Sequence, residues 1–344
     1  MEAVEYKGEK YEVKDGFLDL GLLEIENISD IKGLNKLDIN HLELSSNEII
    51  EIRGLEQLQN LEILNCGSNN ISKISGLENL VNLKVLHLAS NQITEIKGLD
   101  QLSNLKELYL RGNQITHLKG LDCLSSLQKL DLSWNMIENI ESLNSLENLE
   151  VLWLAGNQLT NTQGLEKLKK LNVLNLAGNQ ISEIEGLDNL IHLSEMYLND
   201  NKIQEIKGLE KLTELETLWI TANQIEKINK LDKCKNLRVL NLKDNKIAEI
   251  SGLYPLTKIN KLFLSSNIIS SIKGLETLQN LETLDLGNNF IKAIRGLESL
   301  MVLKDLWLHG NEIDEKLLVQ LGGLDSGGCA LEPLKFVEYC LVNL

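Results

Sequence analysis

Residues 83–102 read LKVLHLASNQITEIKGLDQL, and this pattern decides the fold. Three leucines precede Asn91, two isoleucines follow it, and a Gly-Leu pair comes next. An asparagine recurs with a constant 22-residue spacing, without insertion, from Asn47 to Asn311. A strict period of this length is the sequence signature of a stacked repeat protein. The sequence therefore predicts a solenoid with thirteen 22-residue repeats, each of which we call a rung.

Each rung is predicted to contain a short strand, a turn and a return segment. Leu86 and Leu88 alternate with outward residues, which indicates a strand whose leucines face the core. Asn91 turns the chain, and its amide can hydrogen-bond backbone groups that the turn leaves unpaired. Ten of the twelve complete rungs then have a glycine, with Ser142 and Lys230 as exceptions, which favours a positive φ there. The return segment has room for a 3₁₀ turn but not for a full helix.

Both ends depart from the repeat and are predicted to be caps. Residues 4–13 (VEYKGEKYEV) indicate a β-hairpin, and Glu26 replaces the asparagine in a degenerate first repeat. Residues 314–321 change to helical spacing, and a second helix is predicted from Pro333, because proline favours the first helical position. The predicted organisation is an N-terminal cap over residues 1–38, thirteen repeats over residues 39–313, and a C-terminal helical cap over residues 314–344.

The 22-residue frame with I-x-x-I-x-G-L resembles the Sds22-like class of leucine-rich repeats over residues ~20–320. That class is named for a regulatory subunit of protein phosphatase 1. The resemblance implies an α/β leucine-rich-repeat solenoid, a right-handed superhelical arch with a concave parallel β-sheet and convex 3₁₀ turns. The tail, LGGLDSGGCALEPLKFVEYC (residues 321–340), is similar to the ends of leucine-rich-repeat proteins encoded by Asgard archaea, which implies an archaeal or eukaryotic source.

The residue between the two strand leucines is predicted to point outward from the concave face, and we call these positions the inner column. Six of its thirteen positions are aromatic, in a chain with 4% aromatic residues. Strand propensity explains part of this enrichment, but exposed aromatic side chains on a concave wall are typical of protein-binding surfaces. The aromatic residues predicted to bind a partner are Tyr109, Trp153, Tyr197, Trp219, Phe263 and Trp307, with Trp134 at another outward position. The charged residues predicted to bind with them are Glu107, Arg111, Asp131, Glu195, Asp285 and Asp305.

The resemblance also implies a role for these columns. In the phosphatase regulator, the concave face carries the partner through aromatic and acidic side chains in the same columns. Residues 304–311 (KDLWLHGN) resemble that arrangement most closely, with Asp305 and Trp307 in the matching positions. The resemblance implies that these residues would contact the catalytic subunit of a phosphatase.

The sequence predicts no enzyme, no metal site and no cofactor. An acidic residue lies two positions after most repeat glycines, as Glu56 does, but a carboxylate there is expected to bind N–H groups of the turn. The five histidines show no ligand spacing. Two cysteines replace core leucines, and no histidine follows His309 that could activate the two cysteines of the tail.

The net charge of −16 disfavours nucleic acid and anionic membranes as partners, because both attract basic surfaces. The sequence shows no secretory signal and no apolar run of ~18 residues, so we expect a cytoplasmic protein, or a nuclear one if its source is eukaryotic. Five unevenly spaced cysteines fit a reducing compartment.

These observations predict a non-catalytic scaffold or regulatory subunit that binds a partner protein on its concave face and is a monomer when free. One hypothesis for the partner is a metallophosphatase catalytic subunit. A generic adaptor for a small GTPase or another signalling protein is the alternative. An internalin-like surface adhesin is a third hypothesis, which the missing secretion and anchoring segments disfavour.

Overall fold

The structure is a computed structural model that describes residues 2–343. The chain divides into two compact units. Unit 1 comprises Met1–Leu159 and Gln163–Leu171, and unit 2 comprises Thr160–Thr162 and Asn172–Leu344.

Unit 1 begins with a hairpin of two antiparallel strands, β1 (Ala3–Tyr6) and β2 (Glu9–Glu12). Two 3₁₀ helices, η1 (Ile28–Asp30) and η2 (Leu34–Lys36), lie in the degenerate first repeat. The remaining strands of unit 1 pair in parallel in chain order. They are β3 (Phe17–Asp19), β4 (His41–Glu43), β5 (Ile63–Asn65), β6 (Val85–His87), β7 (Glu107–Tyr109), β8 (Lys129–Asp131) and β9 (Val151–Trp153).

Unit 2 continues the same design and ends with two α-helices. Its strands also pair in parallel in chain order. They are β10 (Val173–Asn175), β11 (Glu195–Tyr197), β12 (Thr217–Trp219), β13 (Val239–Asn241), β14 (Lys261–Phe263), β15 (Thr283–Asp285) and β16 (Asp305–Trp307). The helices are α1 (Glu315–Gln320) and α2 (Pro333–Val342).

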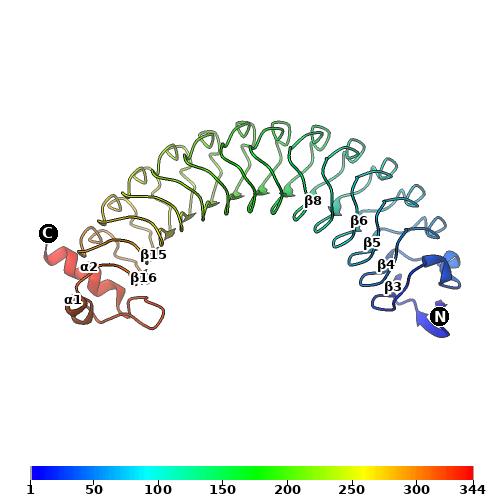
Figure 1. Ribbon diagram of the computed structural model, residues 1–344, viewed down its shortest axis with the longest axis horizontal. Coiled ribbons are helices and arrows are strands. Elements are labelled where there is room, and N and C mark those ends of the chain that lie inside the picture. Colours follow the sequence, from blue (N-terminus) through cyan, green and yellow to red (C-terminus); the bar gives the residue numbers. More distant parts are fainter. Residues whose placement is uncertain (1, 344) are drawn as a thin grey trace. The chain divides into compact units, whose positions relative to one another are not determined.

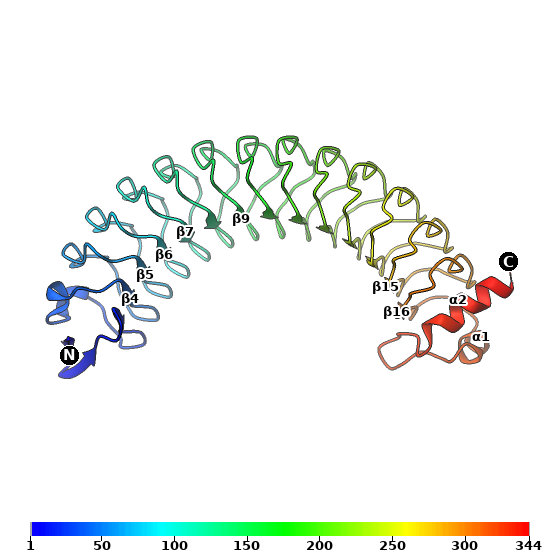
Figure 2. The ribbon, with the colours of Figure 1, turned by 180° about the vertical axis from the view of Figure 1, so that it is seen from behind.

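Within each unit, the strands lie along the inner side and the turns along the outer side (Figures 1 and 2). Strand leucines such as Leu86 are fully buried, as are isoleucines such as Ile93 that come back from the turns. The return segments consist of turns closed by hydrogen bonds between residues three apart, for example from Leu102 N to Leu99 O at 3.0 Å. The predicted solenoid, with a parallel sheet inside and 3₁₀-type turns outside, is confirmed.

The repeat asparagines join successive rungs. Asn113 Nδ2 donates to the carbonyl oxygens of Leu110 in its own rung (2.9 Å) and Leu88 in the preceding rung (3.0 Å). Its Oδ1 accepts a hydrogen bond from Ile93 N of the preceding rung at 2.9 Å. Asn113 is buried, so the predicted role of the amide, to satisfy backbone groups at the turn, is confirmed.

A second asparagine column, on the exposed outer side, is not recognised from the sequence pattern alone. Asn82, Asn104 and Asn280 each donate from Nδ2 to a carbonyl oxygen in the preceding rung, at 2.9 Å in each case. The acceptors are Gln59, Val81 and Thr257. These bonds connect neighbouring rungs in addition to the buried asparagines.

The position of the repeat glycine has a positive φ in all twelve complete rungs. The ten glycines have φ between 71° and 98°, whereas Ser142 and Lys230 both have φ 59°. The smaller angle is close to the left-handed minimum of ordinary residues. The two exceptions therefore keep the turn, at the energetic cost that a Cβ imposes in this region.

Replacing either exception by glycine is expected to stabilise the protein. Ser142→Gly and Lys230→Gly should each raise the free energy of unfolding by about 0.5–1 kcal/mol, because relief of the left-handed strain exceeds the entropy cost of glycine. Urea unfolding measures the change. Ser251→Gly is the control, since Ser251 is exposed and does not have a positive φ. Equal effects at Ser142 and Ser251 would contradict the strain argument.

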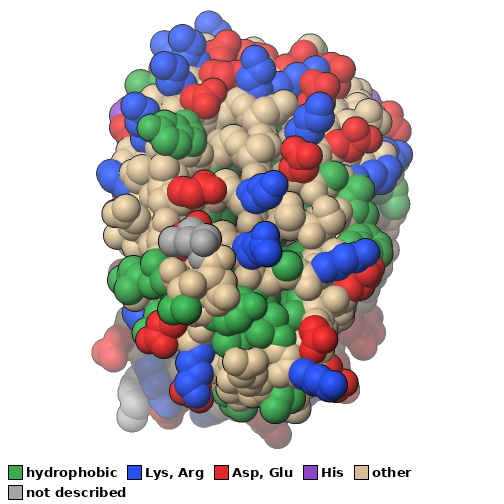
Figure 3. Space-filling model, turned by 90° about the vertical axis from the view of Figure 1, so that its left-hand side faces the viewer, with side chains coloured by type: hydrophobic (Ala, Val, Ile, Leu, Met, Phe, Trp, Pro, Cys, Tyr) green, Lys and Arg blue, Asp and Glu red, His purple; other side chains and the backbone are tan. Residues whose placement is uncertain are grey.

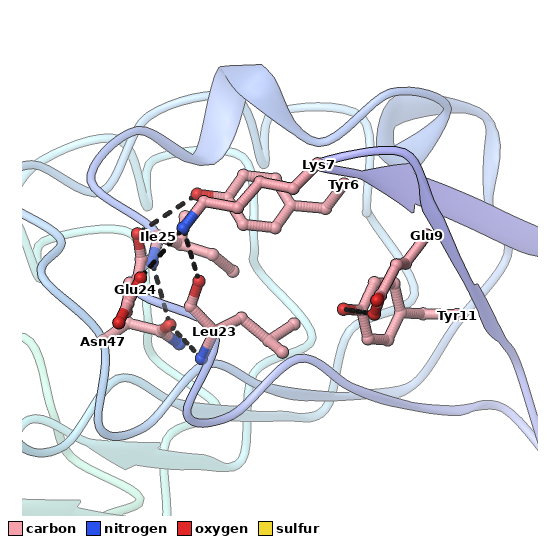
Figure 4. A network of polar contacts seen from close by, with 8 residues as sticks. All are labelled: Tyr6, Lys7, Glu9, Tyr11, Leu23, Glu24, Ile25 and Asn47. Carbon is pink, nitrogen blue, oxygen red and sulfur yellow. Dashed lines mark hydrogen bonds and ion pairs between the residues drawn. The ribbon is translucent and has the colours of Figure 1, made fainter.

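The N-terminal hairpin is confirmed and is hydrogen-bonded to the loop of the degenerate first repeat (Figure 4). Tyr6 Oη donates to Glu24 O at 3.1 Å, and Lys7 Nζ donates to Leu23 O at 3.3 Å. Lys7 also pairs with the Glu24 carboxylate at 3.2 Å. Asn47 Oδ1 accepts hydrogen bonds from Leu23 N at 2.9 Å and from Ile25 N at 3.0 Å. The hairpin and the first repeat asparagine, Asn47, therefore both bond to the loop at residues 23–25.

The C-terminal cap contains both predicted helices. Pro333 is the first residue of α2, and Asp314 caps α1 by accepting a hydrogen bond from Lys316 N at 2.7 Å. The segment between the helices pairs with β16 through an antiparallel bridge between Trp307 and Cys329. Helix α2 buries one face, and hydrophobic side chains also gather at the surface of this end of unit 2 (Figure 3).

Candidate functional site

The inner-column aromatic residues all lie at the surface of the sheet. Trp219 is 38% exposed, and the other five are half-buried. Each occupies the last position of its strand, and paired strands of one unit bring these positions side by side, as in the pair Tyr197↔Trp219. Tyr109 and Trp153 belong to unit 1, and the other four belong to unit 2. The rings are therefore accessible along the inner side of each unit.

In unit 1, Tyr109 is fixed by its neighbours. Its ring stacks on His87 with centroids 4.3 Å apart and planes within 3°. Its hydroxyl donates to Glu107 Oε2 at 2.6 Å, and Lys129 Nζ pairs with Glu107 Oε1 at 3.0 Å. This arrangement holds an aromatic ring, a carboxylate and an ammonium group in one fixed surface.

Burial and hydrogen bonding shift the titration of this group. Burial and the hydrogen bond to Glu107 raise the pKa of Tyr109. Burial lowers the pKa of His87, against the opposing charge of Glu107. The pKa of Glu107 is lowered because hydrogen bonds from Tyr109 and Lys129 outweigh the effect of burial. Near neutral pH the group is expected to present a neutral imidazole and a neutral phenol beside an ion pair.

Unit 2 repeats part of this arrangement. Tyr197 Oη donates to Glu195 Oε2 at 2.6 Å. The Tyr197 ring lies 6.1 Å from that of Trp219, at an interplanar angle of 59°. Burial and the hydrogen bond to Glu195 raise the pKa of Tyr197 to about 12. A second fixed aromatic surface, with a carboxylate beside it, therefore lies in unit 2.

The last rungs of unit 2 place carboxylates between aromatic rings. Asp285 lies between Phe263 and Trp307 in the register of β14, β15 and β16. Its Oδ2 accepts a hydrogen bond from Ser265 Oγ at 2.6 Å, and Asp305 Oδ2 accepts one from Thr283 Oγ1 at 3.0 Å. Within residues 2–343, neither aspartate pairs with a basic side chain. Both carry a negative charge that a cation of a partner could neutralise.

Three further predicted residues lie in or after strands β7 and β8, and one of them, Asp131, pairs in register with Tyr109. Trp134 is not in the inner column; it lies in the turn after β8, where it has φ 57° and is 60% exposed. Arg111 is exposed in the preceding rung. Asp131 occupies the inner column, and its Oδ1 accepts a hydrogen bond from Ser133 N at 2.9 Å.

Exposed apolar residues directly after the repeat asparagine are missing from the sequence-based set. Met136, Ile268 and Phe290 occupy this position, and each is about half exposed. Most other rungs have glutamine, lysine, asparagine or glutamate there. An apolar residue at a position that is otherwise polar is a signal that could have been found in the sequence.

The acidic residues of the outer side bind the turns. Glu56 Oε1 accepts a hydrogen bond from Gly54 N at 3.1 Å, and Glu276 Oε1 accepts one from Gly274 N at 3.1 Å. Across the described residues, no three His, Cys, Asp or Glu side chains come together as a metal site would require. Neither is any helix among residues 2–343 long and apolar enough to cross a membrane.

The two tyrosine–glutamate pairs predict late phenol ionisation in alkali. Each phenol is expected to keep its proton above pH 10 in the folded protein, Tyr197 to about pH 12. Since the unfolded phenol ionises near pH 10, this contribution to stability is present below pH ~10 and is lost as the pH rises through the folded pKa. Titration of the ultraviolet absorbance of tyrosinate measures the ionisation. Tyr109→Phe with Tyr197→Phe should remove a late phase, whereas control Tyr254→Phe, at an exposed outer position, should leave it.

One known protein family matches most of the chain. The family described as Leucine Rich repeats (2 copies) matches residues 39–79, 81–123, 103–145, 125–166, 147–189, 191–233, 235–277 and 279–318. No curated protein sequence matches significantly.

Several solved structures share the fold. An internalin (inlF) of Listeria monocytogenes is 31% identical, with a TM-score of 0.76, and the match covers 87% of this chain and 86% of that one. A leucine-rich-repeat protein of Leptospira interrogans is 26% identical, with a TM-score of 0.76 and coverage of 88% and 92%. The plant peptide hormone receptor RGFR1, in complex with RGF2, is 21% identical, with a TM-score of 0.59 and coverage of 80% of this chain and 52% of that one.

Proposed function

The chain belongs to the family of leucine-rich repeat proteins, and on that premise we propose that it is a non-catalytic scaffold that binds a partner protein on the inner side of its sheet. One observation carries this proposal. Accessible aromatic rings on the inner strands are held by carboxylates, as Tyr109 is by Glu107 and Tyr197 by Glu195. Rigid aromatic side chains with fixed polar neighbours lose little entropy on binding and are typical anchors of protein interfaces.

We propose further that the partner is a metallophosphatase catalytic subunit, which would make this chain a regulatory subunit in the cytoplasm. The segment with Asp305 and Trp307 supports it, since these side chains are accessible at the inner surface of unit 2. Two aspartates without a basic partner there would complement a basic patch on a catalytic subunit. A small GTPase is the alternative partner for the same inner surface.

Partner capture tests the inner-side assignment. The double variant Trp153→Ala with Trp219→Ala is expected to abolish capture of the native partner from a lysate, read by mass spectrometry, and to leave the thermal transition nearly unchanged. Loss of two aromatic anchors typically removes at least ~4 kcal/mol of binding free energy, about a thousandfold in affinity. Tyr254→Ala is the control, because Tyr254 is a 76% exposed aromatic residue on the outer side. Capture that persists in the double variant would show that the inner-side assignment is wrong.

Gel filtration tests whether the partner is a phosphatase. The purified chain should co-elute at micromolar concentration with a metallophosphatase catalytic subunit. Asp285→Asn with Asp305→Asn should weaken this complex more at low than at high salt, because the proposed contact is electrostatic. Absence of a shift in elution volume would refute a phosphatase partner. The proposal of a protein-binding scaffold would then still be decided by the capture test.

The identity to an internalin favours a second candidate, an internalin-like surface adhesin. Both candidates use the inner side for a protein partner, so the double tryptophan variant does not separate them. Fractionation of native cells does: an adhesin would be found at the cell surface, whereas a phosphatase-type regulator would be found with the cytoplasmic catalytic subunit.

A further inference from the structure

Trp134 occupies a backbone position that does not suit a bulky residue. The position directly before each repeat asparagine has a positive φ in all thirteen rungs. The other twelve residues are small or polar: Ser46, Ser68, Ser90, Gly112, Gly156, Gly178, Asp200, Ala222, Asp244, Ser266, Asn288 and Gly310. A large side chain in the left-handed region is costly. The repeat fold therefore gives no reason for a tryptophan here, and strained residues of this kind cluster at functional sites.

The neighbouring rung makes room for the indole ring. A Cβ on Gly156 would lie only 2.8 Å from Trp134 Cδ2 and 3.0 Å from Cε3, so the ring lies directly against the glycine backbone. Gly112 occupies the same position in the preceding rung. With 60% of Trp134 exposed, the ring presents a large apolar surface to solvent.

Met136 is a second exposed apolar residue of this turn. It is 46% exposed and lies two residues after Trp134, with the buried Asn135 between them. Trp134 N donates to Ala155 O at 2.7 Å, which connects this turn to the end of β9, where Trp153 lies in the inner column. The turn that carries Trp134 is therefore joined by a backbone hydrogen bond to the rung that carries Trp153.

An arginine without an ionic partner lies in the adjacent rung. Gly112 N donates to Ser133 O at 2.9 Å, which places Arg111 and Trp134 beside the same backbone contact. The Arg111 side chain is exposed, and within residues 2–343 no ion pair or side-chain hydrogen bond to it is found. Lys129, another cation of this inner surface, is already paired with Glu107. The Arg111 guanidinium is thus available to a carboxylate of a partner.

We propose that Arg111, Trp134 and Met136 form a docking site for a segment of a partner protein that presents an apolar side chain next to a carboxylate. This proposal rests on the protein-binding function proposed above and names the chemistry of one contact. The apolar side chain would cover the indole and the thioether, which are adaptable apolar surfaces. The carboxylate would accept two hydrogen bonds from the planar guanidinium. A basic segment would meet an unpaired positive charge at the same place.

Peptide selection against the full chain tests the proposal. A phage-displayed library of random dodecapeptides would be selected on the purified protein, and the most enriched peptide would be measured by fluorescence anisotropy. Enriched sequences should contain Phe, Trp, Leu or Met within two residues of Asp or Glu. Trp134→Ser and Arg111→Ser should each weaken binding about tenfold or more. The thermal transition should change little in Trp134→Ser, because serine occupies this turn position in four other rungs.

Charge reversal and a control variant complete the test. Arg111→Glu should change the selected sequences from acidic to basic, and Tyr254→Ala, at an exposed aromatic residue on the outer side of unit 2, should leave the peptide affinity unchanged. Selection of basic peptides by the native chain, selection of no peptide, or affinities insensitive to Trp134→Ser and Arg111→Ser would each overturn the proposal. These outcomes concern this site alone, since partner capture by the Trp153→Ala, Trp219→Ala variant decides the general function separately.

Discussion

Asn113→Leu is expected to lower the free energy of unfolding by about 5 kcal/mol, because it leaves several buried backbone groups unpaired. The substitution removes the partners of Ile93 N, Leu88 O and Leu110 O, all of which are bonded to the buried amide at 2.9–3.0 Å. A buried backbone group without a hydrogen-bond partner costs about 1–3 kcal/mol. Whole domains have stabilities of about 5–15 kcal/mol, so most of unit 1 should unfold at a much lower urea concentration. Urea titration followed by circular dichroism measures the effect.

Asn104→Ala is the matched control for that substitution. Asn104 is also an asparagine that bonds to the preceding rung, but it is exposed and makes a single bond, to Val81 O at 2.9 Å. Its loss should cost about 0.5–1.5 kcal/mol, because water can replace the amide. Similar costs at Asn113 and Asn104 would show that the buried asparagines do not dominate the cohesion between rungs.

Gly120→Ala is expected to destabilise the protein by at least about 3 kcal/mol, through backbone strain and steric overlap together. Gly120 has φ 97°, and a Cβ there would overlap the carbonyl oxygen of Ile96 in the preceding rung. The left-handed conformation costs an ordinary residue about 1–2 kcal/mol, and forced overlap in a packed region adds about 1–3 kcal/mol more. Thermal unfolding should show the loss as a clear fall in transition temperature.

Gly54→Ala separates the two contributions. Gly54 occupies the same repeat position with φ 91°, but the nearest atom to a Cβ would be Ser29 N at 3.7 Å. This variant should therefore show only the conformational cost of about 1–2 kcal/mol. If Gly120→Ala were no worse than Gly54→Ala, the close approach of successive rungs would not be what requires glycine.

Periodicity predicts most of the fold because one rung determines the next. The strand, the buried asparagine and the turn at Gly98 follow from spacing alone, and the structure repeats them with small changes. Strand β3 does not follow the repeat spacing. Leu18 pairs with Leu42, whereas strict 22-residue spacing would pair Leu42 with Leu20. The exposed asparagine column is also not predicted by the hydrophobic periodicity, because exposed amides contribute nothing to that pattern.

Side-chain environments in the candidate site are less predictable from sequence. The inner column identifies Tyr109 and Trp219 as outward residues, and the structure places both at the surface. Sequence cannot show that Glu107 is committed to Tyr109 and Lys129 while Arg111 is free, because that choice depends on side-chain geometry between rungs. The strained backbone of Trp134 likewise depends on a turn whose φ only coordinates give.

The antiparallel bridge at Trp307 has a consequence for polymerisation. A stack of parallel strands is a template, and an uncovered terminal strand can recruit the first strand of another molecule and grow into a filament. Ala330 N donates to Leu306 O at 2.7 Å, and Leu308 N donates to Gly328 O at 3.1 Å. These bonds occupy the groups that an incoming molecule would need and present a segment that runs in the opposite direction. Growth at this end is therefore terminated by the molecule itself.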